Sequence, residues 1–375
     1  MALFPTKPVR IQPYFGYRNR HRLMISARAL RAPRPGFERS GRLRAVRTML
    51  AQFASHEVAD LPVELELQHR DGRRFQHRGV TDHEGFVHFD VPLEPAWELN
   101  ANSQWEVVTF RWNNGEGRQS VEGHILAPGS HASLGVISDI DDTIIETGIT
   151  GSWRKIARNW RRVVMELPDD RLLVPGADVF YNALGGGAVL DAGETHTGDR
   201  LAATHHPFFY VSSSPWNLFS YLVAFQKSRG LPLGPLMLRD WGLNRETFGS
   251  GSHGAHKIAA IAGIIETYES MQFALIGDDS QGDLTAFADV VASHPGRVRA
   301  VFIRRAGDPL SPEELAARAV IEAASVPLWL GDCFTAGQQF LDAIGLSHDG
   351  EAERIVEVVE KPNHGAPAAQ RQAEA

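Results

Sequence analysis

The segment VISDIDDTIIETG, residues 136–148, places a group of acidic side chains directly behind a short apolar run. Asp139, Asp141, Asp142 and Glu146 belong to this group. Carboxylates crowded this closely repel one another unless a cation or a hydrogen-bond network holds them. Because the apolar residues before them predict a buried strand, the segment predicts a carboxylate cluster at a strand end.

Other polar residues follow predicted strands in the same way. Ser212 comes directly after FFYV, Asp278 comes directly after FALIG, and Lys257 stands where a helix is expected to begin. The carboxyl ends of parallel strands meet at one edge of a sheet, where ligands bind in such folds. Carboxylates that converge there from distant segments require a hard cation with oxygen ligands, most simply Mg²⁺.

The elements that must position these residues appear after residue 130, where apolar runs alternate with helical patterns. Runs without polar alternation are typical of strands buried on both faces. The expected strands are LGVIS, PFFYV, FALIG and VRAVFI, and the expected helices lie around PGADVFYNAL, WNLFSYLVAFQKSRG, HKIAAIAGIIETY and LTAFADVVASH. Strand and helix in repetition predict the α/β fold class, with an open parallel sheet and helices on both sides.

The chain before residue 130 has a different pattern. Apolar residues alternate with polar ones in LPVELELQH, GFVHFDV, QWEVVTFRW and QSVEGHIL, and turn-forming residues separate these stretches. This pattern predicts a small antiparallel β-sandwich. The stretch GRLRAVRTMLAQFASHEV has its apolar residues at helical spacing and predicts one helix on the sandwich.

These patterns divide the chain into three parts. We expect a sandwich-like domain over residues 1–130, a catalytic domain over 131–345 and a partly disordered tail over 346–375. The single cysteine, Cys333, excludes an intrachain disulfide. The first residues lack the apolar stretch of a secretory signal, and no apolar run reaches the roughly 18 residues that cross a bilayer. We therefore expect a cytoplasmic protein whose membrane contact, if it has one, is peripheral at the inner membrane surface.

Charge is distributed unevenly along the chain. The formal net charge is −7, yet residues 1–50 contain twelve Lys and Arg against one acid, Glu38. Such a segment suits nucleic acid, an anionic lipid surface or the acidic remainder of its own chain. No nucleic-acid-binding signature accompanies it, so we do not expect a nucleic-acid partner. We favour an ordinary solvated face over a lipid-binding one.

Four ordered motifs resemble those of the haloacid-dehalogenase superfamily of aspartyl phosphatases. The motifs are Asp139-Ile-Asp141-Asp142-Thr143, Ser212 after an apolar strand, Lys257, and Gly277-Asp278 with Asp283 five positions on. The resemblance covers roughly residues 134 to 305. It implies a Rossmann-like parallel-sheet domain and hydrolysis through an aspartyl-phosphate intermediate.

The resemblance also implies a role for each catalytic residue. Asp139 would attack phosphorus, and Asp141 would protonate the leaving alkoxide and then activate water. Ser212 would hydrogen-bond a phosphoryl oxygen, although Ser213 and Ser214 compete for this role. Lys257 would offset the negative charge of nucleophile and phosphate. Thr143 would supply a supporting hydrogen bond near the nucleophile.

A Mg²⁺ ion is the implied cofactor. Its implied ligands are the Asp139 side chain, the backbone carbonyl of Asp141 and Asp278. Asp283 is either a further ligand or a residue that orients the site, and we favour orientation. Asp279 competes with Asp278 for the metal, and the position directly after the glycine favours Asp278.

A narrower resemblance concerns the substrate. The stretches SSSPWNLF, GPLMLRDWG, HKIAAIAGIIETYESMQFALIGDDSQGD and HPGRVRAVFIRR are similar to the catalytic domain of the Mg²⁺-dependent phosphatidate phosphatases associated with fungal actin patches, distant cousins of lipins. This implies that phosphatidate is hydrolysed to diacylglycerol. Those relatives commonly read GDSGQ-x-D where this chain reads GDDSQGD. Both outer aspartates are kept, so the departure affects the fine contacts of the loop. The sandwich is not diagnostic, and its partner is unknown.

One further stretch bears on a lipid substrate. GSWRKIARNWRRVVM, residues 151–165, combines tryptophans with basic residues, which suits an anionic membrane surface. A helix that packs over the core with a solvated basic side is an equal alternative. Two other functions share or nearly share the site: a phosphatase for soluble phosphomonoesters, and a non-catalytic phosphatidate-binding module. The binding module normally loses a catalytic aspartate, whereas Asp139 and Asp141 are both present.

Overall fold

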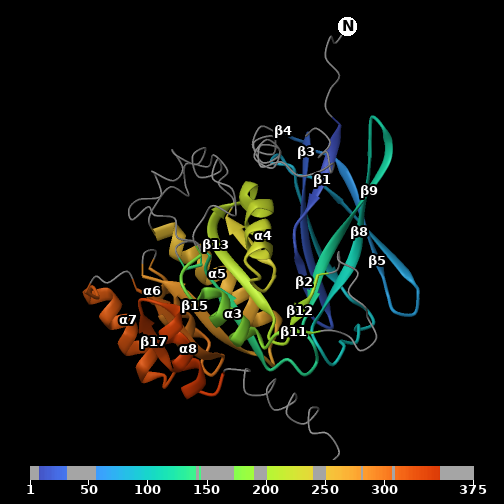
Figure 1. Cartoon of the computed structure of the whole chain (residues 1–375). Coiled ribbons are helices and arrows are strands. Elements are labelled where there is room, and N and C mark those ends of the chain that lie inside the picture. The colour runs from blue at the N-terminus through green and yellow to red at the C-terminus, as the bar shows by residue number, and fades with distance from the viewer. Residues whose placement is uncertain are drawn as a thin grey trace, which may run out of the picture.

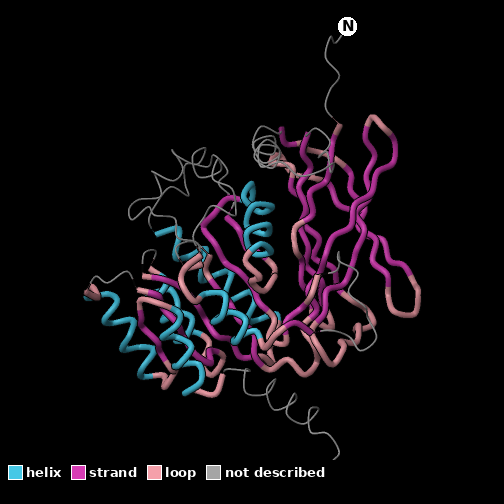
Figure 2. The backbone as a smooth tube through the Cα atoms, in the orientation of Figure 1, coloured by secondary structure: helices cyan, strands magenta, loops and turns pink. Residues whose placement is uncertain are grey.

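The chain folds into two sheet-based units that lie side by side, with helix α4 at their junction (Figure 1). The structure is a computed structural model and describes residues 8–31, 56–140, 143–144, 173–189, 201–239, 251–279, 282–305 and 309–346. In the described ranges, the first unit consists of strands and the second combines strands with helices (Figure 2). This confirms the predicted combination of an N-terminal β unit with an α/β unit.

The N-terminal unit is one mainly antiparallel sheet. Its strands are β1 (Val9–Pro13), β2 (Gly16–Arg18), β3 (Arg22–Arg31), β4 (His56–Glu57), β5 (Pro62–Gln68), β6 (Arg74–Val80), β7 (Phe86–Pro92), β8 (Gln104–Asn114) and β9 (Gly117–Ala127). The main path of the sheet is β1-β3-β2-β9-β8-β5-β6, and β4 and β7 pair with β3. One pair, β2 with β9, is parallel.

The period-two pattern predicted strands β5, β7, β8 and β9 at their places. Their inward residues form one core with those of β1 and β3, including the fully buried Leu65 and Phe110. Strands β1 to β3 were not predicted. In β3 the buried Leu23, Ile25 and Ala27 alternate with the more exposed Arg22, Met24 and Ser26. The predicted helix around residues 41–58 lies largely outside the described residues, and its last part is β4.

The basic N-terminal segment is only partly a solvated face. Arg18 is 1% exposed and Arg28 is 8% exposed, so the interpretation as an ordinary solvated face is wrong for these two residues. Each is buried because an acid of the same chain pairs with it: Glu106 with Arg18 and Glu57 with Arg28. Other arginines of the segment also pair within the chain, as Arg22 does with Asp90 at the surface. The acidic remainder of the chain is therefore a partner of this segment.

The second unit is a parallel sheet covered by helices on both faces. Its sheet has the order β14-β13-β10-β15-β16-β17. The strands are β10 (Leu134–Ser138), β13 (Phe208–Pro215), β14 (Leu236–Arg239), β15 (Gln272–Asp278), β16 (Val298–Arg304) and β17 (Leu328–Gly331), and a separate pair joins β11 (Ala188–Val189) to β12 (Ala203–Thr204). The helices are α3 (Ala177–Gly185), the 3-10 turn η2 (Trp216–Leu218), α4 (Phe219–Ser228), α5 (Gly251–Thr267), α6 (Asp283–Ser293), α7 (Pro312–Ala323) and α8 (Phe334–Ala343).

Successive strand residues face opposite helix layers, which explains the uninterrupted apolar runs. In β10, Val136 packs in the cluster that contains residues of α3, α4 and α8, whereas Ile137 packs in the cluster that contains residues of α5, α6 and α7. Both residues are essentially unexposed. A strand covered on both faces needs apolar residues at every position.

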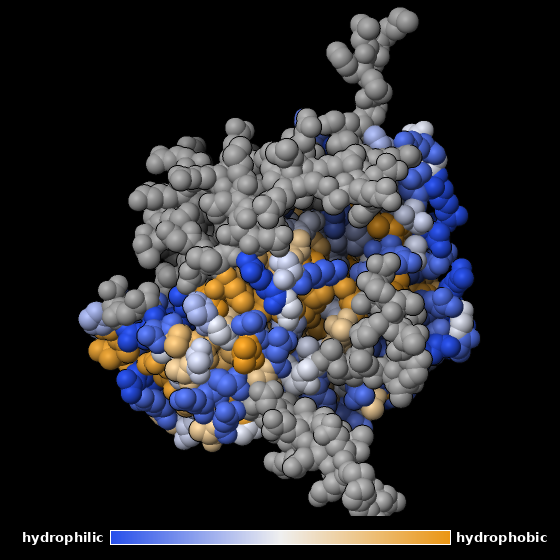
Figure 3. All heavy atoms as spheres, in the orientation of Figure 1, coloured by the Kyte–Doolittle hydropathy of each residue, from blue (hydrophilic) through white to orange (hydrophobic). Residues whose placement is uncertain are grey.

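Among the described residues, no helix is both long and apolar enough to cross a bilayer. The visible face is mostly hydrophilic over the strands farthest from α4, and hydrophobic residues gather where the two units meet (Figure 3). The predicted basic helix at residues 151–165 and the tail beyond residue 346 lie outside the described residues.

Candidate active site

Asp139 stands at the carboxyl end of the central strand β10. Strand β10 pairs in parallel with β13 on one side and β15 on the other. The Asp139 backbone N–H still donates to the carbonyl of Ile276 at 2.8 Å, so the sheet fixes the residue beyond the strand end. Its side chain is buried, and the residue is 2% exposed. The carboxyl ends of three strands therefore surround this carboxylate.

Asp278 and Asp283 form the second acidic element, at the end of β15 and the start of α6. The Asp278 backbone N–H donates to Oδ2 of Asp283 at 3.2 Å. The Asp283 carboxylate lies directly over Gly277, where an added Cβ would collide with it. The glycine before Asp278 thus makes room for the acid five positions on, and both acids are buried.

Lys257, on α5, joins these two acidic elements. Its Nζ lies 3.2 Å from Oδ1 of Asp139 and also contacts Oδ1 of Asp283. Burial disfavours the charged amine, but the negative charges of Asp139 and Asp283 outweigh that effect and hold the pKa of Lys257 above its ordinary value. The side chain is therefore a fixed ammonium between two carboxylates.

Thr143 connects the acids from a third direction. Its hydroxyl lies 2.9 Å from Oδ2 of Asp278 and 3.4 Å from Oδ2 of Asp139. A hydroxyl has one hydrogen, so the shorter contact to Asp278 is the principal hydrogen bond. The hydroxyl of Thr143 thus lies beside both Asp139 and Asp278, and its supporting role in catalysis stays a prediction.

The cluster has the charge and the ligand type that suit a divalent cation. Asp139, Asp278 and Asp283 each offer a carboxylate oxygen, and these oxygens lie within 4.8 Å of one another. Among these side chains, the single ammonium of Lys257 stands against three buried carboxylates. A hard divalent ion such as Mg²⁺ fits an all-oxygen site that keeps an excess of negative charge.

The geometry also bears on the alternatives for the acidic residues. Asp279 lies 3.6 Å from Nε of Arg305 and is outside the carboxylate cluster, so the structure favours Asp278 for metal binding. Both oxygens of Asp283 accept bonds, one from Lys257 and one from the Asp278 backbone, and its orienting role stays a prediction. Asp141 lies outside the described residues.

The three serines after the strand FFYV are all buried at the end of β13. The Ser214 backbone N–H donates to Oγ of Ser212 at 2.9 Å, in the part of β13 where its register with β14 shifts. Ser138 of β10 is opposite Tyr210 in the parallel register, so Ser212 lies at the same sheet edge as Asp139. The choice among the three serines for phosphate binding remains a prediction.

Sequence reasoning missed one residue that is linked to Asp139 through a hydrogen-bond chain. The hydroxyl of Tyr181 on α3 lies 2.6 Å from Oγ of Ser138, and Ser138 donates to the backbone carbonyl of Asp139 at 2.6 Å. Complete burial, assisted by the charges of Asp139 and Asp278, raises the pKa of Tyr181 above its ordinary value. In the sequence this tyrosine looks like any core aromatic of a helix, so no signal distinguishes it.

The fold and the cluster define a class of protein: an α/β domain with an aspartate and lysine site at the carboxyl edge of its parallel sheet. Residues 134–305 match the family model described as "Phosphatidate phosphatase APP1, catalytic domain". This segment is therefore similar to the catalytic domains of the APP1 family.

Two fungal relatives cover about half of this chain. It is 30% identical over 199 residues to "Phosphatidate phosphatase APP1" of Saccharomyces cerevisiae, a match that covers 51% of this chain and 30% of the yeast protein. It is 25% identical over 173 residues to an uncharacterized protein of Schizosaccharomyces pombe, covering 46% of this chain and 25% of that protein. The chain thus spans less than a third of either relative.

One solved structure is similar only at a low level. It is a Bifidobacterium dentium β-glucuronidase complexed with coumarin-3-O-glucuronide, with a TM-score of 0.22 and 8% identity over 87% of this chain and 60% of that chain. A likeness at this level carries no argument about this protein.

Proposed function

We propose that the chain is a Mg²⁺-dependent phosphatidate phosphatase, which hydrolyses phosphatidate to diacylglycerol and phosphate through an aspartyl-phosphate. The observation that carries the proposal is the buried cluster of Asp139, Lys257, Asp278 and Asp283 within the segment that matches the APP1 catalytic domain. The choice of phosphatidate as the substrate is supported by the similarity to the yeast phosphatidate phosphatase and to the matching family model.

Asp139 is the proposed nucleophile. One of its oxygens attacks phosphorus as the bond to the lipid alkoxide breaks, which splits the hydrolysis into two easier steps. Lys257, 3.2 Å from this carboxylate, holds it in place and offsets the charge that the phosphoryl group brings. Ser212, at the neighbouring strand end, is the proposed hydrogen-bond donor to a phosphoryl oxygen.

Asp141 is the proposed general acid and base. Its position two residues after the nucleophile, together with the family resemblance, supports this role. In the first step it gives a proton to the departing alkoxide of diacylglycerol. In the second step it takes a proton from the water that attacks the aspartyl-phosphate, and inorganic phosphate leaves as Asp139 is regenerated.

Mg²⁺ would be held by Asp139 and Asp278, with the backbone carbonyl of Asp141 by family resemblance and with Asp283 as the orienting carboxylate. When bound, the ion would neutralise charge on the phosphoryl oxygens. Thr143 keeps Asp278 in its orientation through the 2.9 Å hydrogen bond.

The proposed place of action is the cytoplasmic surface of an anionic membrane, which the protein would bind peripherally. The stretch 151–165 is the proposed contact because its tryptophans and arginines suit an interface between water and lipid headgroups. In this proposal, residues 151–165 bind the membrane surface, and the aspartate cluster carries out the hydrolysis.

Phosphate release tests the proposal. The chain is assayed with phosphatidate in mixed micelles and with a panel of water-soluble phosphate esters, with and without Mg²⁺. The proposal expects Mg²⁺-dependent release with a clear preference for phosphatidate. A preference for soluble esters would show a soluble-substrate phosphatase. Binding of phosphatidate vesicles without release from any ester would show a binding module.

A further inference from the structure

The N-terminal sheet holds the segment that directly follows the three serines of the site. Arg28, on β3, donates from Nη1 to Oδ1 of Asn217 at 2.7 Å, across the junction of the two units. The same guanidinium donates from Nε to the carbonyl of Glu84 at 2.9 Å and from Nη2 to Oε1 of Glu57 at 3.1 Å. Its Cζ also lies 4.5 Å from the ring centroid of Phe86. Because Nε and Nη2 of this buried side chain are both engaged within the N-terminal unit, Nη1 offers Asn217 a fixed donor.

Aromatic rings surround this hydrogen bond on the same surface. Tyr14 lies 4.4 Å from Trp216 and 4.9 Å from Phe219, measured between ring centroids. Phe15 lies 5.3 Å from Phe219, and Phe86 lies 5.9 Å from Trp216. Three neighbouring residues of the catalytic unit are therefore held by side chains of the N-terminal sheet.

These three residues begin one position beyond the end of the serine strand. Strand β13 ends at Pro215, and Trp216 and Asn217 lie in the turn η2 that leads into α4. On its other side, β13 is fixed by its parallel pairing with β10, which carries Asp139 at its end. The proposed phosphate-binding serines thus lie between an anchor in the catalytic sheet and an anchor in the N-terminal sheet.

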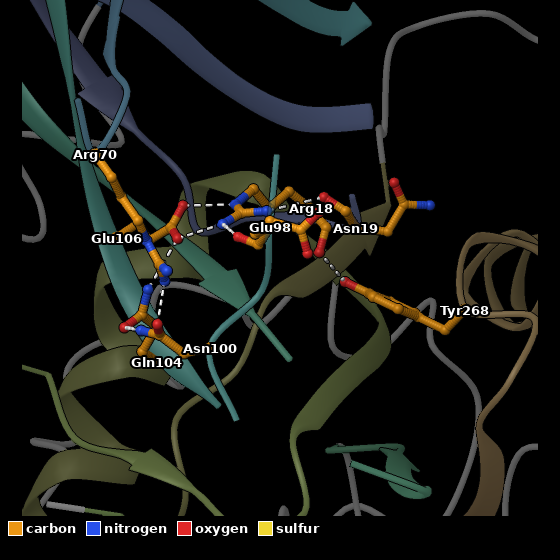
Figure 4. A network of polar contacts seen from close by, with 8 residues as sticks. All are labelled: Arg18, Asn19, Arg70, Glu98, Asn100, Gln104, Glu106 and Tyr268. Atoms are coloured by element: carbon orange, nitrogen blue, oxygen red, sulfur yellow. Dashed lines mark hydrogen bonds and ion pairs between the residues drawn. The ribbon is translucent and has the colours of Figure 1, made fainter. Parts of the chain in front are cut away.

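A second anchor reaches the helix that carries Lys257 (Figure 4). Arg18 is held by Glu106, with Nε at 2.6 Å and Nη2 at 2.5 Å from its carboxylate oxygens. The backbone carbonyl of Arg18 accepts a hydrogen bond from the hydroxyl of Tyr268 at 3.2 Å. Asn19 donates from Nδ2 to the carbonyl of Thr267, the last residue of α5, at 2.8 Å. The N-terminal sheet is therefore attached both to the serine segment and to the helix of the lysine.

We propose that Arg28 is a positioning residue of the phosphatase, which acts through Asn217 to fix the phosphate-binding serine segment, and that the N-terminal sheet is a working part of the active site. The inference rests on the proposed function. Since a phosphate-binding donor contributes to substrate binding in the ground state and in the transition state alike, its displacement raises KM more than it lowers kcat.

Steady-state kinetics of paired variants test the proposal. Arg28→Gln and Asn217→Ala each remove the hydrogen bond, and each is expected to raise KM for a phosphate ester by roughly tenfold with a much smaller change in kcat. Asn217→Asp keeps an acceptor for Arg28 and is expected to keep the wild-type KM within about twofold. The matched control is Arg22→Gln, because Arg22 lies on the same strand and pairs with Asp90 at the surface.

The double variant and a second readout make the outcome decisive. If Arg28 acts through Asn217, the double variant that combines Arg28→Gln with Asn217→Ala raises KM no further than either single variant does. Hydrogen exchange of the amides of residues 212–219 is expected to quicken in Arg28→Gln and to stay unchanged in Arg22→Gln. Unchanged KM and unchanged exchange in both Arg28→Gln and Asn217→Ala would overturn the proposal.

Failure of the proposed function would look different. If the wild-type chain released no phosphate from any ester, the proposed phosphatase function would be wrong. The hydrogen-exchange measurement alone would then test whether Arg28 positions the serine segment. Quicker exchange confined to residues 212–219 in Arg28→Gln would still support that role. Unchanged exchange in this segment, or a lower unfolding temperature without a local change in exchange, would show that Arg28 has only a structural role. Either result would overturn the proposed positioning role.

Discussion

Lys257 Nζ lies 3.2 Å from Oδ1 of Asp139, and the same ammonium contacts Asp283, so one buried cation joins the end of β10 to the start of α6. This relationship holds the proposed nucleophile in a single orientation. It also explains how three buried carboxylates coexist at one sheet edge.

Removal of this ammonium is expected to affect both stability and activity. Lys257→Met leaves buried carboxylates without their cation, which costs about 3 to 5 kcal/mol when one partner of a buried pair is lost. Phosphate release should fall by at least about a hundredfold. Chemical denaturation and phosphate release measure the two effects. Lys227→Met is the control, since Lys227 is an exposed lysine on α4; equal behaviour of the two variants would contradict the account.

The room that Gly277 leaves for Asp283 gives a second prediction. Gly277→Ala places a methyl group against the Asp283 carboxylate. The overpacking should cost about 1 to 3 kcal/mol and displace the carboxylate that holds Lys257, so activity should fall with stability. Gly263→Ala is the matched control because an added Cβ meets nothing within 4 Å there, and alanine in a helix stabilises it slightly. Thermal unfolding and phosphate release are measured for both variants. A Gly277→Ala protein that is as stable and as active as the wild type would refute the packing argument.

The two neighbouring aspartates after this glycine should respond differently to substitution. Asp278→Asn removes a charged ligand and is expected to raise the Mg²⁺ concentration for half-maximal activity by at least about tenfold. Asp279→Asn should leave the Mg²⁺ requirement nearly unchanged, because Asp279 pairs with Arg305. Calorimetric Mg²⁺ titration gives a readout besides activity. The reverse order of the two effects would assign the metal to Asp279.

The junction between the two units carries a pH-dependent contribution to stability. Burial, its main cause, raises the pKa of Tyr268 well above the ordinary value of 10.0. The neutral phenol therefore contributes fully below about pH 10, and this contribution is lost as pH rises toward the pKa of the folded state.

Tyr268→Phe removes the hydrogen bond to Arg18 and the titrating group together. The variant should be less stable than wild type by about 1 kcal/mol at neutral pH. The difference in the free energy of unfolding between the two proteins should become smaller above pH 10. In this range the Tyr268 phenol ionises in the unfolded wild type, which favours unfolding of the wild type but not of the variant. Denaturant unfolding of both proteins across this pH range measures the difference. A difference that stayed constant with pH would contradict the argument that burial raises the pKa of Tyr268.

The sequence predicted strands β10, β13, β15 and β16 well because they are covered on both faces. It did not predict strands β14 and β17 or helices α7 and α8, and the edge strand β17 is only partly buried. The uninterrupted apolar runs before Asp139, Ser212 and Asp278 could belong only to such strands or to buried helices, and their length separated the two. Their carboxyl ends then had to meet at one edge, so the convergence of Asp139, Asp278 and Lys257 followed from topology.

The N-terminal unit was harder to predict because charge hid its pattern. Burial alternates only in the first half of strand β3, and Arg22, Arg28 and Arg31 made the segment look like a solvated basic face. A buried arginine is stable only beside its partner, and the partners Glu57 and Glu106 are distant in sequence. No local pattern reveals such pairing, and the same holds for the contacts of Tyr181 and Arg28.

The most direct test of the account is a search for the covalent intermediate. The wild-type chain is mixed with phosphatidate and Mg²⁺, quenched in acid within the first turnover, digested and examined by mass spectrometry. The account predicts one phosphoryl group on the peptide that contains Asp139, and none on the same peptide of Asp139→Asn, which should fold normally but release no phosphate. Phosphate release at the wild-type rate by Asp139→Asn, or a phosphoryl group on another residue, would contradict it.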